Sequence, residues 1–328
     1  MARRSNDNNK KFGIEVLAGV IIVAVILIIG NFSDSALIKS LLEELEINAL
    51  EDVEQSNPIA PVSNNTNVNG NLVIDYIDVG QGDSILIRQG EAAMLIDGGT
   101  SECRDTLLGY LQSENIDRFE YIIGTHAHED HIGSLDDVVN AYDFDTFLFP
   151  KSTTTTKNFE NLVLAVQAKN KKFTTPEVGK TYQLGEAVFQ ILAPNSESYS
   201  SLNNYSIVIK LTYGQNTFLF TGDAESISET EMLDRGIDVS ADVLKIGHHG
   251  STTSTSKRFL NSVNPKYAVI SCGQNNTYKH PTKTTMDKLQ NAGIPVYRTD
   301  ESGTVECISD GVNITFNVEP GTYSYLGG

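Results

Sequence analysis

The 328-residue chain has few of the residues that define several common protein classes. It has three cysteines, Cys103, Cys272 and Cys307, and none stands in a CxxC or similar spacing, which excludes a zinc ribbon built on thiolates. Their odd number also excludes a fully paired disulfide framework. A bond between Cys272 and Cys307 stays open if their strands are neighbours, but burial as small apolar side chains is the favoured interpretation.

Basic residues are also scarce. The chain carries 24 Lys and Arg against 42 Asp and Glu, a formal net charge of −18. Residues 71–328 alone carry 19 basic and 33 acidic side chains, a net charge of −14. Because a surface that grips duplex nucleic acid is usually basic, this balance argues against tight, nonspecific polyanion binding through side chains alone.

A long apolar run occurs only once, near the N-terminus. Residues 16–30 hold no charge and follow a basic flank, and the run reaches 21 residues when it is counted from 12 to 32. A membrane-spanning helix needs about 20 mainly apolar residues, whereas the apolar part of a signal peptide has about 7–15. We therefore predict a basic cytoplasmic tail at 1–11 and an uncleaved membrane anchor at 12–32, with a cleaved signal segment as the alternative.

The basic flank predicts that the N-terminus stays inside and that the rest of the chain lies outside the cell membrane, or is secreted if the segment is cleaved. Residues 33–54 are predicted to form a helical stalk, because Leu and Ile recur three and four positions apart against an acidic face. The stalk could self-associate or stand as a single juxtamembrane helix. Residues 55–71, rich in Asn, Pro and Ser, are predicted to be a disordered linker.

Residues 72–318 alternate short apolar strands with helices and precede a short tail at 319–328. Strands are expected at 72–79, 84–89, 92–97, 120–125, 146–150, 187–192, 206–213, 216–221, 242–246, 267–272, 295–298, 303–308 and 312–318. Helices are expected near 104–113, 134–142, 158–170, 225–235, 255–262 and 282–292. Two sheets with helices outside would suit this order, so the predicted fold class is a layered α/β sandwich.

Histidine is scarce too, with six in the chain, yet three of them fall in the stretch "GTHAHEDHIGS" at 124–134. His126, His128, Asp130 and His131 directly follow an expected strand. Imidazole and carboxylate are ligands that zinc, manganese and iron accept, and the His/His and Asp/His sets suit two adjacent ions. Because no thiolate is offered, a catalytic metal is favoured over a structural one. The alternative is a polar loop whose hydrogen bonds are satisfied internally.

Two later strand ends add to this set. Asp223, in "FLFTGDAE", could bridge two ions, which lie about 3.5–4 Å apart in such sites. In "KIGHHGS", a turn flanked by glycines could aim both histidines at one pocket, so we predict His248 as a metal ligand and His249 as a ligand or a substrate contact. Lys245 could bind a substrate anion, although a solvated lysine is the commoner case.

The sixth histidine, His280, stands in "NNTYKHPT" just before an expected helix. It could reach a leaving group or a phosphate oxygen. The alternative is a loop histidine that caps the helix. No histidine of the chain therefore lies outside the segments that carry candidate site residues.

Taken together, the HxHxDH motif, a strand ending in Gly-Asp and a later histidine resemble the signature of the metallo-β-lactamase superfamily. Four further segments are similar to the extracellular hydrolase domain of ComEC-type DNA-uptake competence proteins and its stand-alone relatives. These segments are "YIDVGQGDSILIR" (76–88), "LIDGG" (95–99), "LFTGDAE" (219–225) and "DVLKIGHHGS" (242–251). The resemblance covers nearly all of 71–318.

This resemblance implies a four-layer αββα sandwich with a dinuclear centre at one sheet edge. The implied ligands are His126 and His128 for the first ion, Asp130, His131 and His248 for the second, and Asp223 as the bridge. Asp97 would brace the histidine loop without binding metal. Asp83 and the turn at 80–82 would shape the rim of the pocket.

The chain departs from the family pattern in two places. The superfamily usually has another histidine about twenty residues before the bridging aspartate, where this chain has Asn203 and Asn204. The first ion is therefore expected to be weakly held or completed by water. A complete ComEC-type protein also carries a large multi-span channel, and one short span at most is expected here, so the chain is not expected to be that channel.

These features predict an exported, membrane-anchored hydrolase that uses two divalent ions, zinc in the first place and manganese as the alternative. Such ions supply a hydroxide nucleophile at neutral pH, which suits phosphodiester hydrolysis in single-stranded nucleic acid or a small nucleotide. Asp130, Lys245, His249 and His280 are the predicted catalytic residues. The alternatives are hydrolysis of a β-lactam or lactone on the same centre, and a non-catalytic protein that interacts through its stalk.

Overall fold

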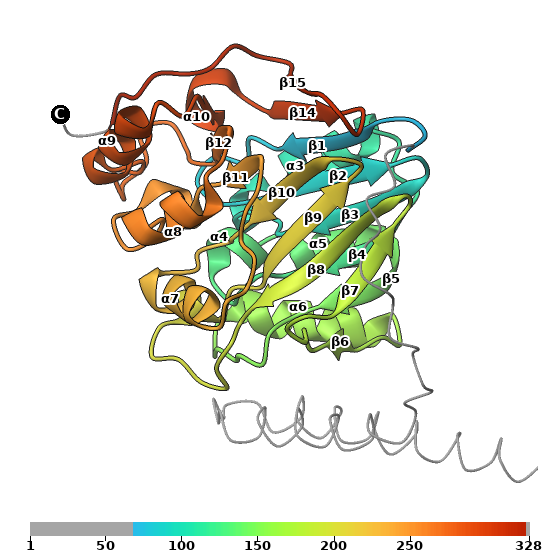
Figure 1. Ribbon diagram of the computed structural model, residues 1–328. Helices are drawn as coiled ribbons and strands as arrows, with labels where there is room; N and C mark the ends of the chain where they lie inside the picture. Colours follow the sequence, from blue (N-terminus) through green and yellow to red (C-terminus); the bar gives the residue numbers. More distant parts are fainter. Residues whose placement is uncertain (1–67, 326–328) are drawn as a thin grey trace, which may run out of the picture. The chain divides into compact units, whose positions relative to one another are not determined.

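The computed structural model describes residues 68–325, which fold around two β-sheets (Figure 1). The eight-stranded sheet has the order β15-β14-β1-β2-β3-β4-β5-β6. Its strands are β1 (Leu72–Tyr76), β2 (Ile85–Gln89), β3 (Ala92–Ile96), β4 (Arg118–Ile123), β5 (Asp143–Leu148), β6 (Phe173–Thr174), β14 (Val305–Ser309) and β15 (Ile314–Phe316).

The seven-stranded sheet has the order β13-β12-β11-β10-β9-β8-β7. Its strands are β7 (Thr181–Leu184), β8 (Ala187–Ala193), β9 (Val208–Tyr213), β10 (Asn216–Phe220), β11 (Val243–Lys245), β12 (Tyr267–Ile270) and β13 (Val296–Arg298). Both sheets combine antiparallel and parallel pairs. The parallel runs are β3 to β6 in the first sheet and β10 to β13 in the second.

Helices cover the outer faces of both sheets. The longer ones are α3 (Arg104–Ser113), α5 (Leu135–Ala141), α6 (Lys157–Ala168), α7 (Ser226–Asp234), α8 (Lys257–Val263) and α9 (Lys283–Ala292). Short helical turns are η1 (Ser101–Cys103), α4 (Glu129–Ile132), η2 (Leu202–Tyr205), η3 (Gly247–Gly250) and α10 (Thr299–Ser302). The first three of the longer helices share a buried cluster with the eight-stranded sheet, and α7, α8 and α9 share one with the seven-stranded sheet.

A third apolar cluster fills the space between the two sheets. It combines side chains of the first sheet, such as Ile74 and Met94, with side chains of the second, such as Phe189 and Phe218. The alternation of strand residues between this cluster and the outer ones explains why nearly every position of the central strands is buried. The layer order is therefore helices, sheet, sheet, helices, and the predicted α/β sandwich with two sheets is confirmed.

The cysteines separate along the same layers. All three are buried and free, as the interpretation of small apolar side chains predicts. Cys307 lies in the cluster between the sheets, whereas Cys272 lies in the outer cluster under α8 and α9. A Cys272–Cys307 disulfide is therefore excluded, because the two thiols lie in different layers.

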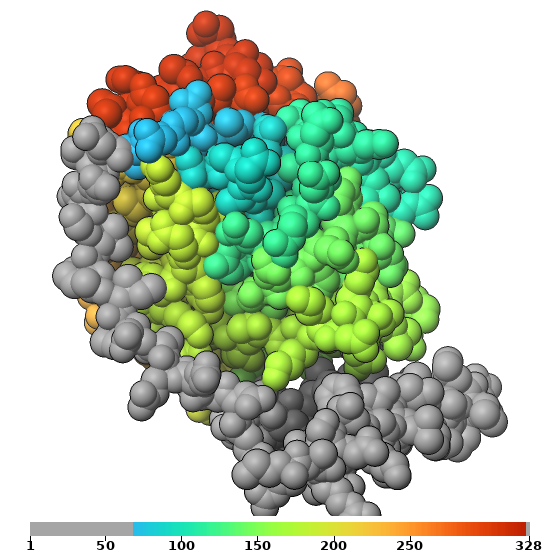
Figure 2. Space-filling view, turned by 90° about the vertical axis from the view of Figure 1, so that its right-hand side faces the viewer, coloured from blue at the N-terminus to red at the C-terminus, as the bar shows by residue number. Residues whose placement is uncertain are grey.

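The C-terminal segment adjoins the N-terminal strands of the domain. β14 pairs with β1 along its whole length, and Figure 2 shows the red C-terminal region directly against the blue of β1. Beyond β15, the segment that was expected to be a tail is also held, since the Arg298 guanidinium donates to the carbonyl oxygens of Thr322 and Ser324. The hydroxyl of Tyr323 donates to the carbonyl oxygen of Ile294.

The predicted cytoplasmic tail, the anchor at 12–32, the stalk at 33–54 and most of the linker lie outside the described residues. Between residues 68 and 325 no helix is long and apolar enough to cross a membrane.

Candidate metal centre

The chemically important side chains lie at the carboxyl ends of parallel strands from both sheets. Asp97 directly follows β3, and the histidine loop follows β4. Asp223 comes just after β10, and the vicinal histidines come just after β11. Because parallel strands end at the same edge, their loops converge there, which is the usual position of ligand sites in α/β proteins.

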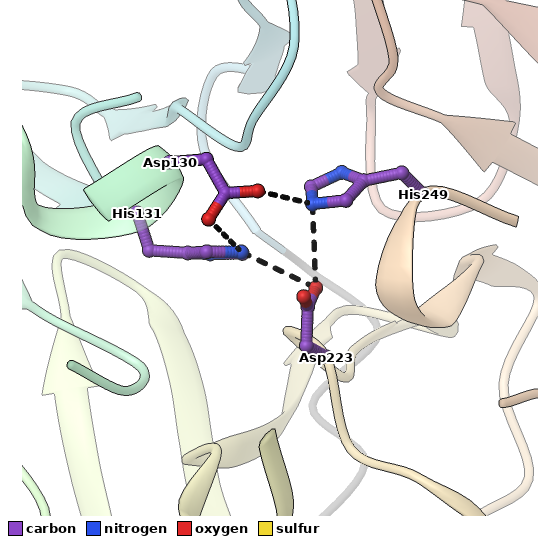
Figure 3. Close-up of side chains that lie close together, drawn as sticks. All are labelled: Asp130, His131, Asp223 and His249. Carbon is purple, nitrogen blue, oxygen red and sulfur yellow. Dashed lines mark ion pairs between the residues drawn. The ribbon is translucent and has the colours of Figure 1, made fainter. Parts of the chain in front are cut away.

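Four of these side chains form a compact cluster. Ligand atoms of Asp130, His131, Asp223 and His249 all lie within 4.8 Å of one another (Figure 3). The Nε2 atom of His131 is 3.3 Å from Oδ1 of Asp223, and Nε2 of His249 is 3.5 Å from the same oxygen. Nε2 of His249 is also 3.3 Å from Oδ2 of Asp130. The cluster joins the histidine loop of one sheet to two loops of the other.

Three atoms of this cluster are buried without a hydrogen-bond partner among the described residues: Nε2 of His131, Oδ1 of Asp223 and Nε2 of His249. Buried polar atoms are nearly always satisfied in folded proteins, so three orphans aimed at one another need an explanation. Imidazole nitrogen and carboxylate oxygen are the donor types of divalent zinc or manganese. The residues therefore fit a divalent cation placed among them.

Contacts behind the cluster orient both of its histidines. Nδ1 of His131 is 2.7 Å from Oδ2 of Asp97, and Nδ1 of His249 is 2.9 Å from the carbonyl oxygen of Ser271. A carbonyl oxygen only accepts, so Nδ1 of His249 carries a proton, and in the neutral imidazole Nε2 would present its lone pair to a metal ion. Acceptors of this kind behind metal-binding histidines fix the tautomer and the ring orientation.

Asp97 itself is fully buried and lies behind the histidine loop. Its backbone is left-handed, with φ of 61°, and its carboxylate accepts from the amide and the hydroxyl of Thr125 at 2.7 Å each. A second set of close ligand atoms joins Asp83, Asp97 and His131. Those carboxylates already have protein donors, however, since Thr125 occupies Asp97 and Lys245 occupies Asp83.

His126 and His128 lie on the other side of Asp223. Nε2 of His126 is 3.9 Å from Oδ2 of Asp223 and 2.9 Å from Nδ1 of His128. Nε2 of His248 is 3.6 Å from the same Oδ2. Each carboxylate oxygen of Asp223 therefore faces a different group of histidines, which is the arrangement expected of a carboxylate between two ions.

The vicinal histidines occupy a strained turn. Both have left-handed backbone, with φ of 51° for His248 and 53° for His249, and they stand between Gly247 and Gly250. Such conformations are uncommon for residues other than glycine and cluster at functional sites. The turn brings both rings to Asp223, but only His249 joins the four-residue cluster. Nδ1 of His248 is 3.0 Å from Oγ1 of Thr253.

Lys245 forms a buried ion pair behind His249. Its ammonium donates to Asp83 at 2.9 Å and to the carbonyl oxygen of Ile246 at 3.0 Å, and its side chain is 1% exposed. Asp83 in turn lies 3.4 Å from Nδ1 of His249. Lys245 was predicted as a possible contact for a substrate anion. In the structure its ammonium is enclosed by Asp83 and the carbonyl of Ile246.

The turn at 80–82 passes closely under the histidine loop. Gly82 has φ of +135°, and a Cβ added there would lie 2.3 Å from the carbonyl oxygen of Asp130. The amide of Asp83 donates to that same carbonyl at 3.1 Å. On its other side, Gly80 and Gln81 border an open hollow of about 650 Å³ whose lining includes none of the predicted metal ligands.

His280 completes the group of rings. It is 8% exposed, and its Nδ1 has no hydrogen-bond partner in the described part of the chain. Its ring centroid is 5.4 Å from that of His248 and 6.4 Å from that of His249. The rings of all six histidines of the chain therefore lie next to one another in a continuous group.

The carboxylates control the charge of the cluster. Burial lowers the pKa of His249, but Asp223, Asp83 and Asp130 outweigh burial and raise it to about 10. Burial likewise lowers the pKa of His131, and the same kind of carboxylate contact raises it well above its usual range. The buried carboxylates thus favour positive charge at this position, either on the imidazole rings or on a divalent cation bound among them.

Sequence reasoning missed several side chains that support the site. The hydroxyl of Ser206 accepts from the amide of Asp223 at 3.0 Å and lies 3.4 Å from Nδ1 of His126. Asn203 and Asn204, at the position where a histidine was missing, donate to the carboxylate of Glu225 at 3.1 and 3.0 Å. Family spacing pointed to Asn203 and Asn204 only as the place of an absent histidine, and no sequence signal pointed to Ser206, because short polar residues in loops are common.

Comparison with known proteins agrees with the fold. Residues 77–274 match the family model described as the metallo-beta-lactamase superfamily. The chain belongs to this superfamily.

Its relatives include competence proteins. It is 31% identical to ComE operon protein 3 of Bacillus subtilis (strain 168) over 265 residues, 75% of this chain and 34% of that protein. It is 30% identical to competence protein ComA of Neisseria gonorrhoeae over 231 residues, 70% of this chain and 31% of that protein. The predicted resemblance to ComEC-type proteins is confirmed, although the chain spans only about a third of the length of these relatives.

Among solved structures, a mutant of the CmlA beta-hydroxylase aligns with a TM-score of 0.51 and 14% identity. The alignment covers 81% of this chain and 59% of that one. At this level of identity the likeness concerns the fold alone.

Proposed function

We propose that the chain is a metal-dependent phosphodiesterase of the cell surface that acts on single-stranded nucleic acid or small nucleotides. The observation that carries the proposal is the convergence of three buried atoms that make no hydrogen bond in the described residues, on His131, Asp223 and His249, beside Asp130. Membership of the superfamily supports metal-dependent hydrolysis. The competence-protein relatives support a substrate related to nucleic acid.

We assign the ligands of two divalent ions, zinc in the first place, from the two oxygens of Asp223. Asp130, His131 and His249 surround Oδ1 and would hold one ion. His126 and His128 lie toward Oδ2 and would hold the other. In the ligand set with Asp130 and His131, this assignment replaces His248 with His249, because only His249 lies in the compact cluster.

His248 is then available to the ion of His126 and His128. Its Nε2 faces Oδ2 of Asp223 at 3.6 Å, the same oxygen that His126 faces. This contact offers that ion a further nitrogen in place of the histidine that the sequence lacks near Asn203.

When bound, the ions would supply a hydroxide nucleophile and stabilise the charge that develops on the phosphoryl oxygens. The residues of the chain position these groups. Lys245 holds Asp83 in place, and Asp83 and the Ser271 carbonyl hold the ring of His249. Burial, together with His249 and His248, lowers the pKa of His280 to about 4, so it would contact a leaving oxygen as a neutral imidazole.

The acidic surface is compatible with this proposal. Residues 71–328 carry a net charge of −14, so a phosphodiester would be held mainly at the metal centre and not along a basic groove. Such a site suits a single strand or a small nucleotide better than a gripped duplex.

The test combines metal content with turnover of two chromogenic substrates, a phosphodiester and a β-lactam. We expect bound divalent metal and phosphodiester turnover in the wild type. Both should be lost in Asp130→Ala and His249→Ala and kept in the control Asp117→Ala, which changes an exposed carboxylate just before β4, at the opposite end of that strand from the histidine loop. Turnover that persists without Asp130 and His249 would refute the assignment. Turnover of the lactam alone would favour a β-lactam or lactone hydrolase.

We also propose that residues 12–32 anchor the chain in the cell membrane with the hydrolase domain outside. The support is the uncharged run behind a basic flank. Protease added to intact cells should remove the domain from the cell surface, and protection of the domain until the cells are lysed would contradict this topology.

A further inference from the structure

The loop from Gly273 to His280, between β12 and α9, carries an exposed aromatic side chain beside the metal centre. Tyr278 is 65% exposed, which makes it the most exposed of the large apolar side chains on the surface of residues 68–325 and the only aromatic one among them. An isolated exposed side chain of this kind is ordinary in itself. Tyr278 differs because its ring stacks on that of His280, which adjoins the metal centre.

Three rings lead from the cluster to the solvent. The ring of His280 lies 6.4 Å from that of His249, with an angle of 25° between their planes. The ring of Tyr278 lies 5.9 Å from that of His280, at 23°. The outermost ring therefore stacks on that of His280 and is open to the solvent, two ring contacts away from a predicted metal ligand.

The loop is fixed from below by hydrogen bonds. The Asn276 side-chain amide donates to the carbonyl oxygens of Gly273 and His280, and its Oδ1 accepts from the His280 amide at 3.0 Å. The Gly273 amide donates to Oε1 of Gln81 at 3.2 Å. In the described structure the Tyr278 hydroxyl makes no hydrogen bond of its own, so the polar group of this residue does not explain its position.

Because the domain is acidic, its affinity for a nucleic acid has to come from contacts other than basic side chains, and an exposed aromatic ring could supply one. A single strand that is not gripped by a basic groove must gain affinity elsewhere, and stacking on one aromatic side chain tightens binding by about 5- to 150-fold per base. A base in a duplex is already stacked on its neighbours, so only an unpaired base can use such a ring. The exposed Lys279, next in the chain, adds a cation at the same place.

From this geometry we infer that Tyr278 is a stacking platform for an unpaired nucleobase next to the scissile phosphodiester, and that it selects single-stranded nucleic acid or nucleotides over duplex. The inference rests on the proposed function and specifies the substrate of the same site. His280 supports the platform from the inside, while the metal centre holds the adjoining phosphate. Base identity is not read, because every base has a face that can stack.

Binding can be tested without turnover because the chain contains no tryptophan. In the full-length chain, Tyr278→Trp introduces a single tryptophan at the platform, whose emission can be excited selectively over that of the tyrosines. A phosphorothioate thymidine octamer, which resists hydrolysis, should quench its fluorescence. An abasic octamer of equal charge and a duplex of the same length should quench it much less. Leu164→Trp, on the exposed face of α6, is the matched control and should respond to none of them.

Kinetics provide the second readout. Tyr278→Ala should raise KM for a thymidine octamer by roughly 10- to 100-fold with little change in kcat, because a stacking contact is made in the ground state as well. Tyr278→Phe, which keeps the ring, should retain the wild-type KM. Cleavage of the abasic octamer should be the same in all three proteins.

The outcomes separate this inference from the proposed function. Equal quenching by the octamer and its abasic analogue, or no quenching by either, overturns the platform even if phosphodiesters are cleaved. An unchanged KM in Tyr278→Ala also overturns it. If the wild type cleaves no phosphodiester at all, the proposed function fails, and base-dependent quenching then still decides whether Tyr278 binds a base.

Discussion

The carboxylate of Asp97 is predicted to control metal binding without touching the metal. Asp97→Asn keeps the shape of the side chain and, like aspartate, tolerates the left-handed backbone at this position. Its carbonyl oxygen can still accept from the amide of Thr125, and the hydroxyl of Thr125 can rotate to accept from the new amide group. His131 has no such choice, because its Nδ1 now faces a donor.

His131 can respond in two ways, and both harm the cluster. It can lose the hydrogen bond, or it can move its proton to Nε2, the atom that faces Asp223. A protonated Nε2 cannot bind a metal ion. Replacing the acceptor behind a metal-binding histidine typically lowers metal affinity by about 10- to 100-fold. The loss of one hydrogen bond to a charged group should lower the free energy of unfolding of the metal-free protein by about 1.5–3 kcal/mol.

Burial of Asp97 reduces the expected loss of stability. Desolvation raises the pKa of this carboxyl, so its charge is costly to bury, and Asp97→Asn removes that cost. The decrease in the free energy of unfolding should therefore lie near the lower end of the range given above. The assay is titration with zinc in competition with a chelating dye, alongside urea unfolding in EDTA. Asp117→Asn, at an exposed carboxylate, is the control. Wild-type zinc affinity in Asp97→Asn would refute the reasoning, whatever happens to stability.

Three further outcomes follow from the contacts around the site. Gly82→Ala should weaken zinc binding more than Gly80→Ala, because both positions have positive φ but only at Gly82 would a Cβ collide with backbone, at 2.3 Å; equal effects in the zinc titration would contradict this. Lys245→Met should lower the free energy of unfolding by about 3–5 kcal/mol by leaving Asp83 buried without its partner, and adding Asp83→Asn should recover most of the loss in urea unfolding. In metal-free protein, burial lowers the pKa of His280 from 6.5 to about 4, so the stability it contributes is present above pH 6.5 and lost as the pH falls toward 4; unfolding measured across this range should lose less stability in His280→Gln than in the wild type.

Much of the fold could be predicted because its central strands are apolar and bounded by turns. The expected strand at 92–97 corresponds to β3, which is buried at every position. The shorter β6 and β7 were missed. β7, with the sequence TYQL, is half-buried at the sheet edge and shows no apolar run, and β6 has two residues. Edge strands of this kind depend on pairing with a neighbour, which the local sequence does not encode.

The candidate site shows where sequence reasoning stops. The histidine loop and Asp223 stand out because their residue types are concentrated at strand ends. The choice between His248 and His249 could not be made, because it depends on two consecutive left-handed residues, and strand alternation says nothing about such a turn. The pairing of Lys245 with Asp83 spans 162 positions, so only the packing of the two sheets reveals it.

The same packing determines when the site comes into existence. The histidine loop belongs to one sheet, whereas Asp223 and His249 follow strands of the other, so neither half of the domain offers a complete set of ligands. During synthesis the first half emerges well before the second, and a site that is absent from the unfolded chain cannot select an ion. Metal would therefore be acquired only after both sheets have met. Which ion the protein carries would then be decided by the ions available in the compartment where folding is completed, more than by the ligands alone.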